Sequence, residues 1–424
     1  MSSKALIIDY WSDYNRGDAM MQVAILQLIK QWPADVVLDS GCNEFREFSK
    51  QLDETTKVGD VSFYPSPKLS YFFRGEGKFQ ILLNKLCLIA NVFVFHFFYL
   101  LNAVGLKTLL PKSVRSFFQQ VKNADVIIWN GRNFRSNKKF FEFFEFFDLC
   151  CAAIAALYMG KKVYALGVSI WLPKSRIGLL LLRAVFSRCA TVYAREDISL
   201  EVLQREIIPT YKNKCAYLPD LSFFYMKNNL EENEDLRSEG IYTIGIVPKD
   251  PVRRNSVSLQ EYSNYIVRIA EAVISELAEG REIQFKFVNQ AVLDNEPNEE
   301  AVAIISEALC PLGVIVDPMR RPMLSDLSEA YRSCDFVISS RMHGCIMSAY
   351  LGRPFIGIPY DAGAKWGILQ RLGECVLVPM EDIGGKREDF TLLIERSQKF
   401  SPKNRMLQES DEIESIIQNV IGLR

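Results

Sequence analysis

The chain has 424 residues, of which 49% are hydrophobic and 24% are charged. This length suffices for two domains with separate cores, and the composition is typical of globular proteins, which excludes the disordered and fibrous classes. Since 50 basic residues nearly balance 51 acidic ones, the chain lacks the net positive charge that nucleic-acid binding favours, and we expect no nucleic-acid partner.

The cysteines and histidines argue against a metal site. Ten cysteines are scattered without a C-x-x-C pair, and the chain has two histidines, His96 and His343. Zinc sites need such ligands at close spacing, so we expect neither a metal nor a cofactor. The scattered thiols indicate a reducing compartment. The first ten residues lack the features of a signal peptide, and we expect a cytoplasmic protein.

The first predicted unit is a strand, a polar loop and a helix, at residues 4–10, 11–18 and 19–32. Its loop contains Asn15, Gly17 and Asp18. Glycine permits a tight turn there, and a helix N-terminus offers backbone N–H groups to an anion. Asp18 either caps the helix or holds a sugar hydroxyl. The loop does not match the dinucleotide fingerprint, and a Walker A sequence does not occur, so neither kind of nucleotide binding is supported.

Residues 79–106 are very apolar and about as long as a membrane-spanning helix. Asn84, Lys85, Asn91 and His96 interrupt the run. Three interpretations stay open: a buried helix, a helix in the membrane interface and a membrane anchor. The polar interruptions favour the first two, and we expect peripheral contact with the inner face of the cytoplasmic membrane. His96 is interpreted as a satisfied histidine on an apolar helix.

A second strand, at residues 124–131, ends at Gly131 and leads through a loop to a densely packed helix from Phe140 that carries a thin stripe of acids. Further strands are predicted at 162–168 and 191–194, and alternation of strands with helices indicates a mostly parallel sheet. Arg195 follows the latter strand. Its guanidinium suits a carboxylate or phosphate, or else a salt bridge with Glu196 or Asp197, whereas Leu218-Pro219-Asp220 is interpreted as a structural turn.

A charged stretch at 227–240 is the best candidate for a linker. After it we predict a helix near 259–278 and strands at 242–247, 283–288, 314–316, 336–339 and 355–358. The domains are therefore predicted at 1–226 and 241–424, the second including a terminal helix near 411–421, although that helix could pack on either domain. The prediction is an α/β protein whose two domains face each other across a cleft.

The most informative residues follow the strand at 336–339. Ser340, Arg341 and His343 form a polar turn that leads into a helix of small and apolar residues. In open α/β sheets ligands bind at the carboxyl ends of strands, although Arg341 and His343 could merely cap the helix. Lys365, after the next strand, is either a second phosphate cation or a solvated lysine. Together with Arg195, these side chains suit a small, doubly anionic ligand and one proton donor.

An ordered set of motifs from Ile8 to Lys365 resembles the polysaccharide pyruvyl transferase family. The motifs are Asn-x-Gly-Asp, Ala-Arg-Glu-Asp-x-Ser, Pro-Asp, Ser-Ser-Arg-Met-His, Gly-x-Pro and the later lysine. The resemblance implies two Rossmann-like domains in a glycosyltransferase-B-like arrangement. It also implies phosphoenolpyruvate as donor, bound by the second domain, and a sugar of a surface polysaccharide or of its lipid-linked precursor as acceptor, bound by the first.

The resemblance also assigns residues. It implies that His343 and Arg341 are catalytic. It implies substrate contacts by Arg195, Lys365, Asn15, Gly17, Asp18, Gly131 and Ser340. One departure concerns Gly131, since many relatives have a glycine-rich turn where this chain reads Trp129-Asn-Gly-Arg-Asn133.

Ketal formation from phosphoenolpyruvate needs a general acid with a pKa near neutrality, and His343 suits this role, although it could instead protonate the leaving phosphate or act as a base. Arg195 and Arg341 are expected to clamp the two anionic ends of the donor, and no step requires a metal. Two alternatives remain open: a sugar-nucleotide-dependent glycosyltransferase of the same architecture, and a non-catalytic glycan-binding protein. The ligand that binds distinguishes them.

Overall fold

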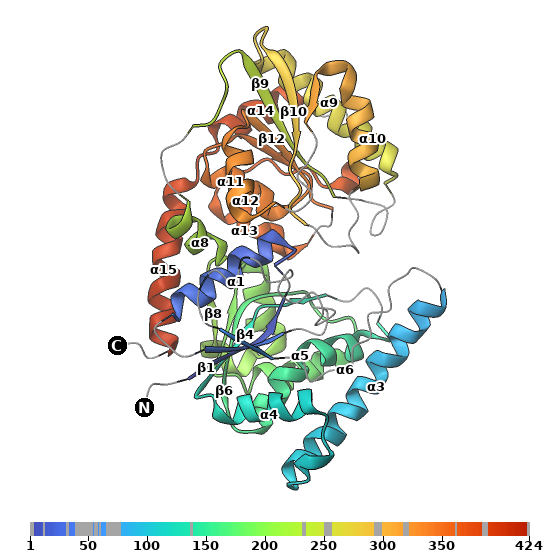
Figure 1. The fold of residues 1–424 in the computed structure, drawn as a ribbon, viewed down its shortest axis with the longest axis vertical. Coiled ribbons are helices and arrows are strands. Elements are labelled where there is room, and N and C mark those ends of the chain that lie inside the picture. Colours follow the sequence, from blue (N-terminus) through green and yellow to red (C-terminus); the bar gives the residue numbers. More distant parts are fainter. Residues whose placement is uncertain are drawn as a thin grey trace. The chain divides into compact units, whose positions relative to one another are not determined.

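Two parallel β-sheets organise the chain, one in each of two units (Figure 1). The computed structural model describes residues 4–11, 13–30, 34–38, 54, 58, 61–64, 78–135, 139–230, 235–249, 257–291, 299–316, 322–360, 363–383 and 389–421. The first unit comprises Met1–Asp13, Met21–Leu221 and Glu412–Arg424, and the second comprises Tyr14–Met20 and Ser222–Asp411. Helix α1 (Arg16–Leu28) contributes to both units, because a boundary follows Met20.

The sheet of the first unit has eight strands among the described residues, in the order β3-β2-β1-β4-β6-β7-β8 with β5 paired to β6. These strands are β1 (Ala5–Tyr10), β2 (Ala34–Leu38), β3 (Ser62–Tyr64), β4 (Val126–Asn130), β5 (Asn133–Phe134), β6 (Lys162–Ile170), β7 (Thr191–Ala194) and β8 (Cys215–Tyr217). Their pairings are parallel, with Ile7 opposite Ile128. All six residues of β1 are buried, as expected for a parallel strand covered on both faces.

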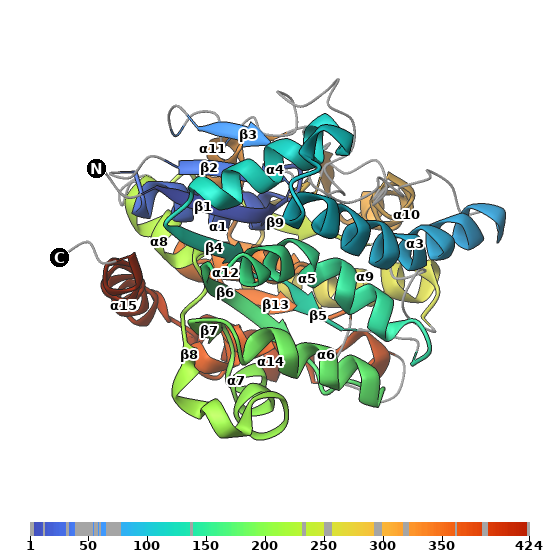
Figure 2. The same cartoon turned by 90° about the horizontal axis from the view of Figure 1, so that it is seen from below.

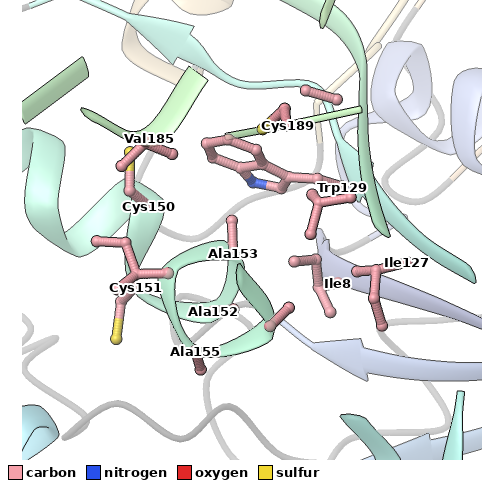
Figure 3. Close-up of a cluster of buried hydrophobic side chains, with 14 of the residues drawn as sticks. Ile8, Ile127, Trp129, Cys150, Cys151, Ala152, Ala153, Ala155, Val185 and Cys189 are labelled. Carbon is pink, nitrogen blue, oxygen red and sulfur yellow. The ribbon is translucent and has the colours of Figure 1, made fainter. Parts of the chain in front are cut away.

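Helices of the first unit are α3 (Lys78–Ala103), α4 (Lys112–Asn123), α5 (Glu142–Tyr158), α6 (Arg176–Phe186) and α7 (Asp197–Val202). Figures 1 and 2 show α4, α5 and α6 covering one face of the sheet. In Figure 3, Trp129 of β4 lies among small residues of α5, Ala153 included, and Cys189. Those small side chains let α5 approach the sheet closely, so that the helix packs into a contiguous core.

Two of the acidic residues of α5, Glu142 and Asp148, lie inside the protein. Glu142 is buried and accepts hydrogen bonds from the backbone N–H groups of Lys174, at 2.8 Å, and Ser175, at 2.6 Å. Asp148 is buried and accepts from Asn91 Nδ2 at 3.2 Å. The thin polar stripe therefore satisfies buried donors, because few other partners are available to them inside the unit.

The sheet of the second unit has five parallel strands among the described residues, in the order β11-β10-β9-β12-β13. They are β9 (Ile241–Val247), β10 (Glu282–Phe287), β11 (Val314–Val316), β12 (Phe336–Ser339) and β13 (Phe355–Gly357). The helices are α8 (Ser222–Asn229), α9 (Leu259–Leu277), α10 (Glu299–Leu309), α11 (Leu324–Arg332), α12 (Met342–Tyr350), α13 (Gly367–Leu372), α14 (Phe390–Lys399) and α15 (Lys403–Ile421). The strands predicted from apolar runs thus occur close to their expected positions.

The units differ from the predicted domains of 1–226 and 241–424 in three places. The second unit begins at Ser222 and includes α8, residues 14–20 belong to the second unit, and the last ten helical residues belong to the first. Buried Phe223 and Met226 explain part of the difference, since these apolar residues of α8 precede the charged stretch that suggested a linker. Asp235, inside that stretch, forms an ion pair with buried Arg353 at 2.8 Å.

Helix α3 corresponds to the apolar stretch at 79–106. The interpretation of this stretch as a buried helix is wrong, because 11% of its most apolar window is buried. The interpretation of His96 is confirmed: its Nδ1 lies 2.6 Å from the carbonyl oxygen of Val92, and its ring stacks on Phe147 at 5.4 Å between centroids. By length and composition, Leu82–Ala103 could cross a membrane.

Candidate functional site

The turn between β12 and α12 places Arg341 and His343 at the start of a helix. Ser339 holds this turn, since its Oγ donates to the carbonyl oxygen of Arg341 at 2.9 Å and accepts from the Arg341 N–H at 3.2 Å. Arg341 is the N-cap residue in extended conformation, and α12 begins at Met342. A buried guanidinium and an imidazole therefore lie where a helix N-terminus also favours anions.

His343 packs directly against Gly17, so two motifs far apart in sequence meet. A Cβ atom placed on Gly17 would lie 2.1 Å from His343 Nδ1 and 2.6 Å from its Cγ. Such distances are far below van der Waals contact, and the imidazole thus occupies the space that a side chain at position 17 would fill. Both residues belong to the second unit.

The segment Tyr14–Met20 is held in the second unit by backbone and side-chain contacts. Asn15 forms an antiparallel bridge with Ala291, and the Arg16 N–H donates to the carbonyl oxygen of Gln290 at 3.0 Å. The fully buried Arg16 side chain donates from Nε to the carbonyl oxygen of Pro322 at 2.7 Å. Asp18 follows in the first turn of α1, where the helix dipole stabilises a carboxylate.

Beside the first turn of α12, Gly344 allows three polar groups to approach the helix closely. A Cβ atom on Gly344 would lie 2.4 Å from Ser339 Oγ, 2.9 Å from Tyr331 Oη and 3.3 Å from Gln290 Oε1. Burial raises the pKa of Tyr331 well above its usual value, so its hydroxyl keeps its proton. In the part of the chain that the structure describes, buried Tyr331 Oη and Gln290 Nε2 have no hydrogen-bond partner.

Lysines gather around Tyr360 in the same unit. The Nζ atom of Lys365 lies 4.2 Å from the centroid of the Tyr360 ring, and that of Lys249 lies 4.1 Å from it. Tyr262 Oη lies 2.5 Å from Ser340 Oγ and accepts a hydrogen bond from the Lys249 N–H at 3.4 Å. Ser340, next to Arg341, is therefore linked to the residue that carries one of the two ammonium groups.

Arg195 lies in the first unit in a buried polar network. Its Nε donates to Ser169 Oγ at 2.8 Å, and its Nη2 donates to Asn133 Oδ1 at 3.0 Å. The guanidinium also forms ion pairs with Asp220 at 3.4 Å and Glu196 at 3.8 Å. The predicted alternative of a salt bridge with Glu196 is thus present, and two carboxylates lie next to its positive charge.

Burial is the largest influence on the pKa of Glu196. Desolvation raises the pKa of its carboxyl, although Arg195 and the hydroxyls of Ser199 and Ser169 lower it. Ser199 Oγ donates to Glu196 Oε1 at 2.6 Å, and Ser169 Oγ to Oε2 at 3.1 Å. Glu196 therefore belongs to the internal framework that orients Arg195.

Gly131, also in the first unit, permits close approach of two strands. A Cβ atom at this position would lie 2.0 Å from the carbonyl oxygen of Leu166. A packing requirement thus accounts for this glycine.

At the end of β1, buried Asp9 has φ of 58° and accepts from Trp129 Nε1 at 2.8 Å. Such a conformation is costly for a non-glycine residue and occurs often at functional sites.

The predicted site residues thus divide between the two units. Asn15, Gly17, Asp18, Ser340, Arg341, His343 and Lys365 belong to the second unit, and Gly131 and Arg195 belong to the first. Sequence reasoning missed Lys249, Gln290 and Asp9. Each lies at or just after the carboxyl end of a parallel strand, which is the signal that could have found them.

Among the residues that the structure describes, no group of three or more His, Cys, Asp or Glu side chains is placed to hold a metal ion. The positive groups around α12 and Tyr360, together with one imidazole, suit a ligand that carries its own negative charges. The imidazole is a group that can donate or accept a proton.

Comparison with known proteins identifies relatives of this chain. Residues 15–362 match the family described as polysaccharide pyruvyl transferase. The amylovoran biosynthesis protein AmsJ of Erwinia amylovora is 22% identical over 281 residues. That match covers 62% of this chain and 63% of AmsJ, which is less than two thirds of the relative's length.

Solved structures show the same fold. UDP-GlcNAc 2-epimerase from Neisseria meningitidis bound to UDP-GlcNAc has a TM-score of 0.56 and 13% identity, over 98% of this chain and 100% of that one. The UDP-GlcNAc 2-epimerase from Methanocaldococcus jannaschii has a TM-score of 0.55 and 11% identity, over 98% and 99%. The predicted fold class, two Rossmann-like α/β domains of glycosyltransferase-B-like type, is confirmed.

Proposed function

Since the chain belongs to the polysaccharide pyruvyl transferase family, a family of transferases, we propose that it moves the enolpyruvyl group of phosphoenolpyruvate onto a saccharide. The product is a pyruvate ketal of a surface polysaccharide or of its lipid-linked precursor, and phosphate is released. The observation that carries the proposal is the Arg341–His343 turn, with the imidazole packed against Gly17 inside the matched region.

The donor binds in the second unit. Phosphoenolpyruvate carries a phosphate and a carboxylate, and Arg341 suits either group because its guanidinium can donate two parallel hydrogen bonds. Lys365 and Lys249, which share the ring of Tyr360, hold the phosphate as point charges. The backbone N–H groups at the start of α12 add further donors.

His343 acts as the general acid. It delivers a proton to C3 of phosphoenolpyruvate, so that C2 gains oxocarbenium character and one acceptor hydroxyl adds to it. The bond between C2 and the phosphate oxygen then breaks, and a second hydroxyl of the sugar closes the ketal. Each of the two acceptor hydroxyls loses its proton. One proton returns to His343, in place of the one given to C3, and the other leaves with phosphate.

The remaining site residues keep their predicted roles as proposals. Asn15, Gly17 and Asp18 position His343 and the substrates, and Ser340 supports the turn before Arg341. Arg195, predicted to clamp one end of the donor, already pairs with Asp220 and Glu196. Its charge is thus largely balanced, and replacing it is expected to disturb the first unit as well as substrate binding.

Thermal-shift titrations with phosphoenolpyruvate, UDP-sugars and GDP-sugars test the donor. We expect saturable stabilisation by phosphoenolpyruvate, lost in Arg341→Ala and kept in Arg205→Ala, which changes an exposed arginine of the first unit. Stabilisation by a nucleotide sugar in place of phosphoenolpyruvate would favour glycosyl transfer. Equal responses of the two variants would remove Arg341 from the donor site.

A further inference from the structure

Helix α3 presents a stripe of large apolar side chains to solvent. They are Phe79, Leu82, Leu86, Phe93, Phe97, Leu100 and, just after the helix, Val104, each between 52% and 70% exposed. Steps of three, four and seven residues place them on one face of a helix. A stripe of this length is rare on a soluble surface and marks a site of interaction.

The opposite face of α3 packs on α5, which fixes the helix to the first unit. Near its middle, Asn91 Nδ2 donates to buried Asp148, and the ring of His96 stacks on Phe147. Near its end, Tyr99 Oη donates to the carbonyl oxygen of Tyr158 at 3.3 Å. Crossing a bilayer would break these contacts, so α3 is placed to lie along a membrane surface.

The sequence around this stripe is basic. Residues 78–124 contain no Asp or Glu. The segment contains Lys78, Lys85, Lys107, Lys112, Arg115 and Lys122. Because the whole chain has a formal charge of −1, positive charge is concentrated here. Lysines and arginines next to an inserted apolar face are attracted to anionic lipid headgroups.

Helix α6 and the segment just before it also expose large apolar side chains. Leu172, Ile177 and Leu180 are each more than half exposed, and residues 149–195 again contain no Asp or Glu. Helix α5 packs against both α3 and α6, and Figure 2 shows the three helices side by side. Two apolar and basic segments thus belong to one layer of the first unit.

We propose that α3 and α6 form a docking surface for an anionic lipid bilayer, with the exposed face of α3 inserted among the headgroups and upper acyl chains. A second copy of the chain fits less well, because a symmetric dimer through α3 would bring the same basic segments together. A bilayer offers both apolar depth and negative charge. This inference does not depend on the proposed catalytic activity.

Vesicle flotation with the purified full chain tests the proposal. We expect binding to vesicles of phosphatidylcholine and phosphatidylglycerol in a 7:3 ratio, and at least about tenfold weaker binding to phosphatidylcholine alone. Phe93→Ser/Phe97→Ser is expected to weaken binding by about tenfold or more, since two exposed aromatic rings lose their apolar burial. Val314→Ser/Leu392→Ser, at exposed apolar positions of the second unit, is expected to bind like the parent.

Charge is tested in the same way. Lys107→Glu/Lys112→Glu, at exposed positions, is expected to weaken binding by about tenfold or more, whereas Lys399→Glu/Arg405→Glu in the second unit has no effect. Thermal melting of each variant checks the fold. The proposal is overturned if the parent protein does not float with the vesicles, or if Phe93→Ser/Phe97→Ser binds as tightly as the parent. It is also overturned if bound protein resists extraction with alkaline carbonate, or if the protein is a dimer that this variant dissociates.

Discussion

A methyl group on Gly17 would enter the space of the His343 ring, so Gly17→Ala tests whether this contact positions the imidazole. Alanine favours the helix that Gly17 occupies, so we expect the fold to remain stable while the imidazole moves. Ketal formation should fall by about a hundredfold, the usual size of a lost acid–base contribution. The ketal methyl signal in proton NMR of the cell's polysaccharide measures it, and a normal signal would contradict the proposed positioning.

His343→Gln tests whether His343 supplies the proton. Glutamine keeps polar atoms in the same region but cannot act as a general acid near neutral pH, so turnover should fall by about a hundredfold or more. Binding of phosphoenolpyruvate, followed by thermal shift, should persist because Arg341 and the lysines remain. Near-normal ketal content in cells that carry this variant would remove His343 from the mechanism.

The placement of some residues could be predicted from local sequence, and that of others could not. The placement of Arg341 and His343 directly after a buried strand could be predicted from the apolar run that precedes them. Gln290 could not, because its proximity to Gly344 depends on packing between segments distant in sequence. Local sequence identifies Arg195 as a cation that follows a strand, but at Asp220, the ion-pair partner of Arg195, it indicates only a structural turn.

At the scale of the element, the N-terminus of α9 carries a capping box. Ser258 Oγ accepts from the Glu261 N–H at 3.2 Å, and Glu261 Oε2 accepts from the Ser258 N–H at 2.8 Å. Ser258→Ala should cost about 1 kcal/mol of helix stability. Faster hydrogen exchange in the first turn of α9 would report the loss. Ser275→Ala, at an exposed position in the same helix, should leave that exchange unchanged.

Helices with strong periodicity were predictable, but the environment of α3 was not. Its composition is apolar on most sides, and the polar interruptions that favour a buried or interfacial helix over an anchor do not distinguish the first two. What decides is its packing partner: α5 covers one side of α3 and leaves the other to solvent. That contact joins residues far apart in the chain, which local patterns do not encode.

At the scale of the whole molecule, the cysteines should differ sharply in reactivity. Burial raises the pKa of Cys189 and Cys334 to about 12 and that of Cys215 and Cys375 to about 11. Thiolate is the reactive form, so these residues should resist brief alkylation of the native protein at pH 8, whereas exposed Cys310 reacts. Peptide mapping before and after denaturation measures this. Labelling of Cys334 as fast as Cys310 would contradict the described packing.

The two-sheet architecture could be predicted from the alternation of strands and helices, but the residues that make up each unit could not. Residues 14–20 are close in sequence to β1, yet the bridge from Asn15 to Ala291, the contacts of Arg16 and the packing of Gly17 against His343 join them to the second unit. Local sequence does not assign the terminal helix to one unit either, since its apolar residues fit either core. Cys42 lies outside the described residues.

The path of the backbone constrains how such a protein can be recombined. Between residues 13 and 14, 20 and 21, 221 and 222, and 411 and 412, the chain passes from one unit to the other. A chimaera that exchanges 222–411 as one block would import His343 but keep the host's residues at positions 14–20. His343 would then pack against a foreign helix start, so exchange of the second unit between relatives requires a second, seven-residue graft near the N-terminus.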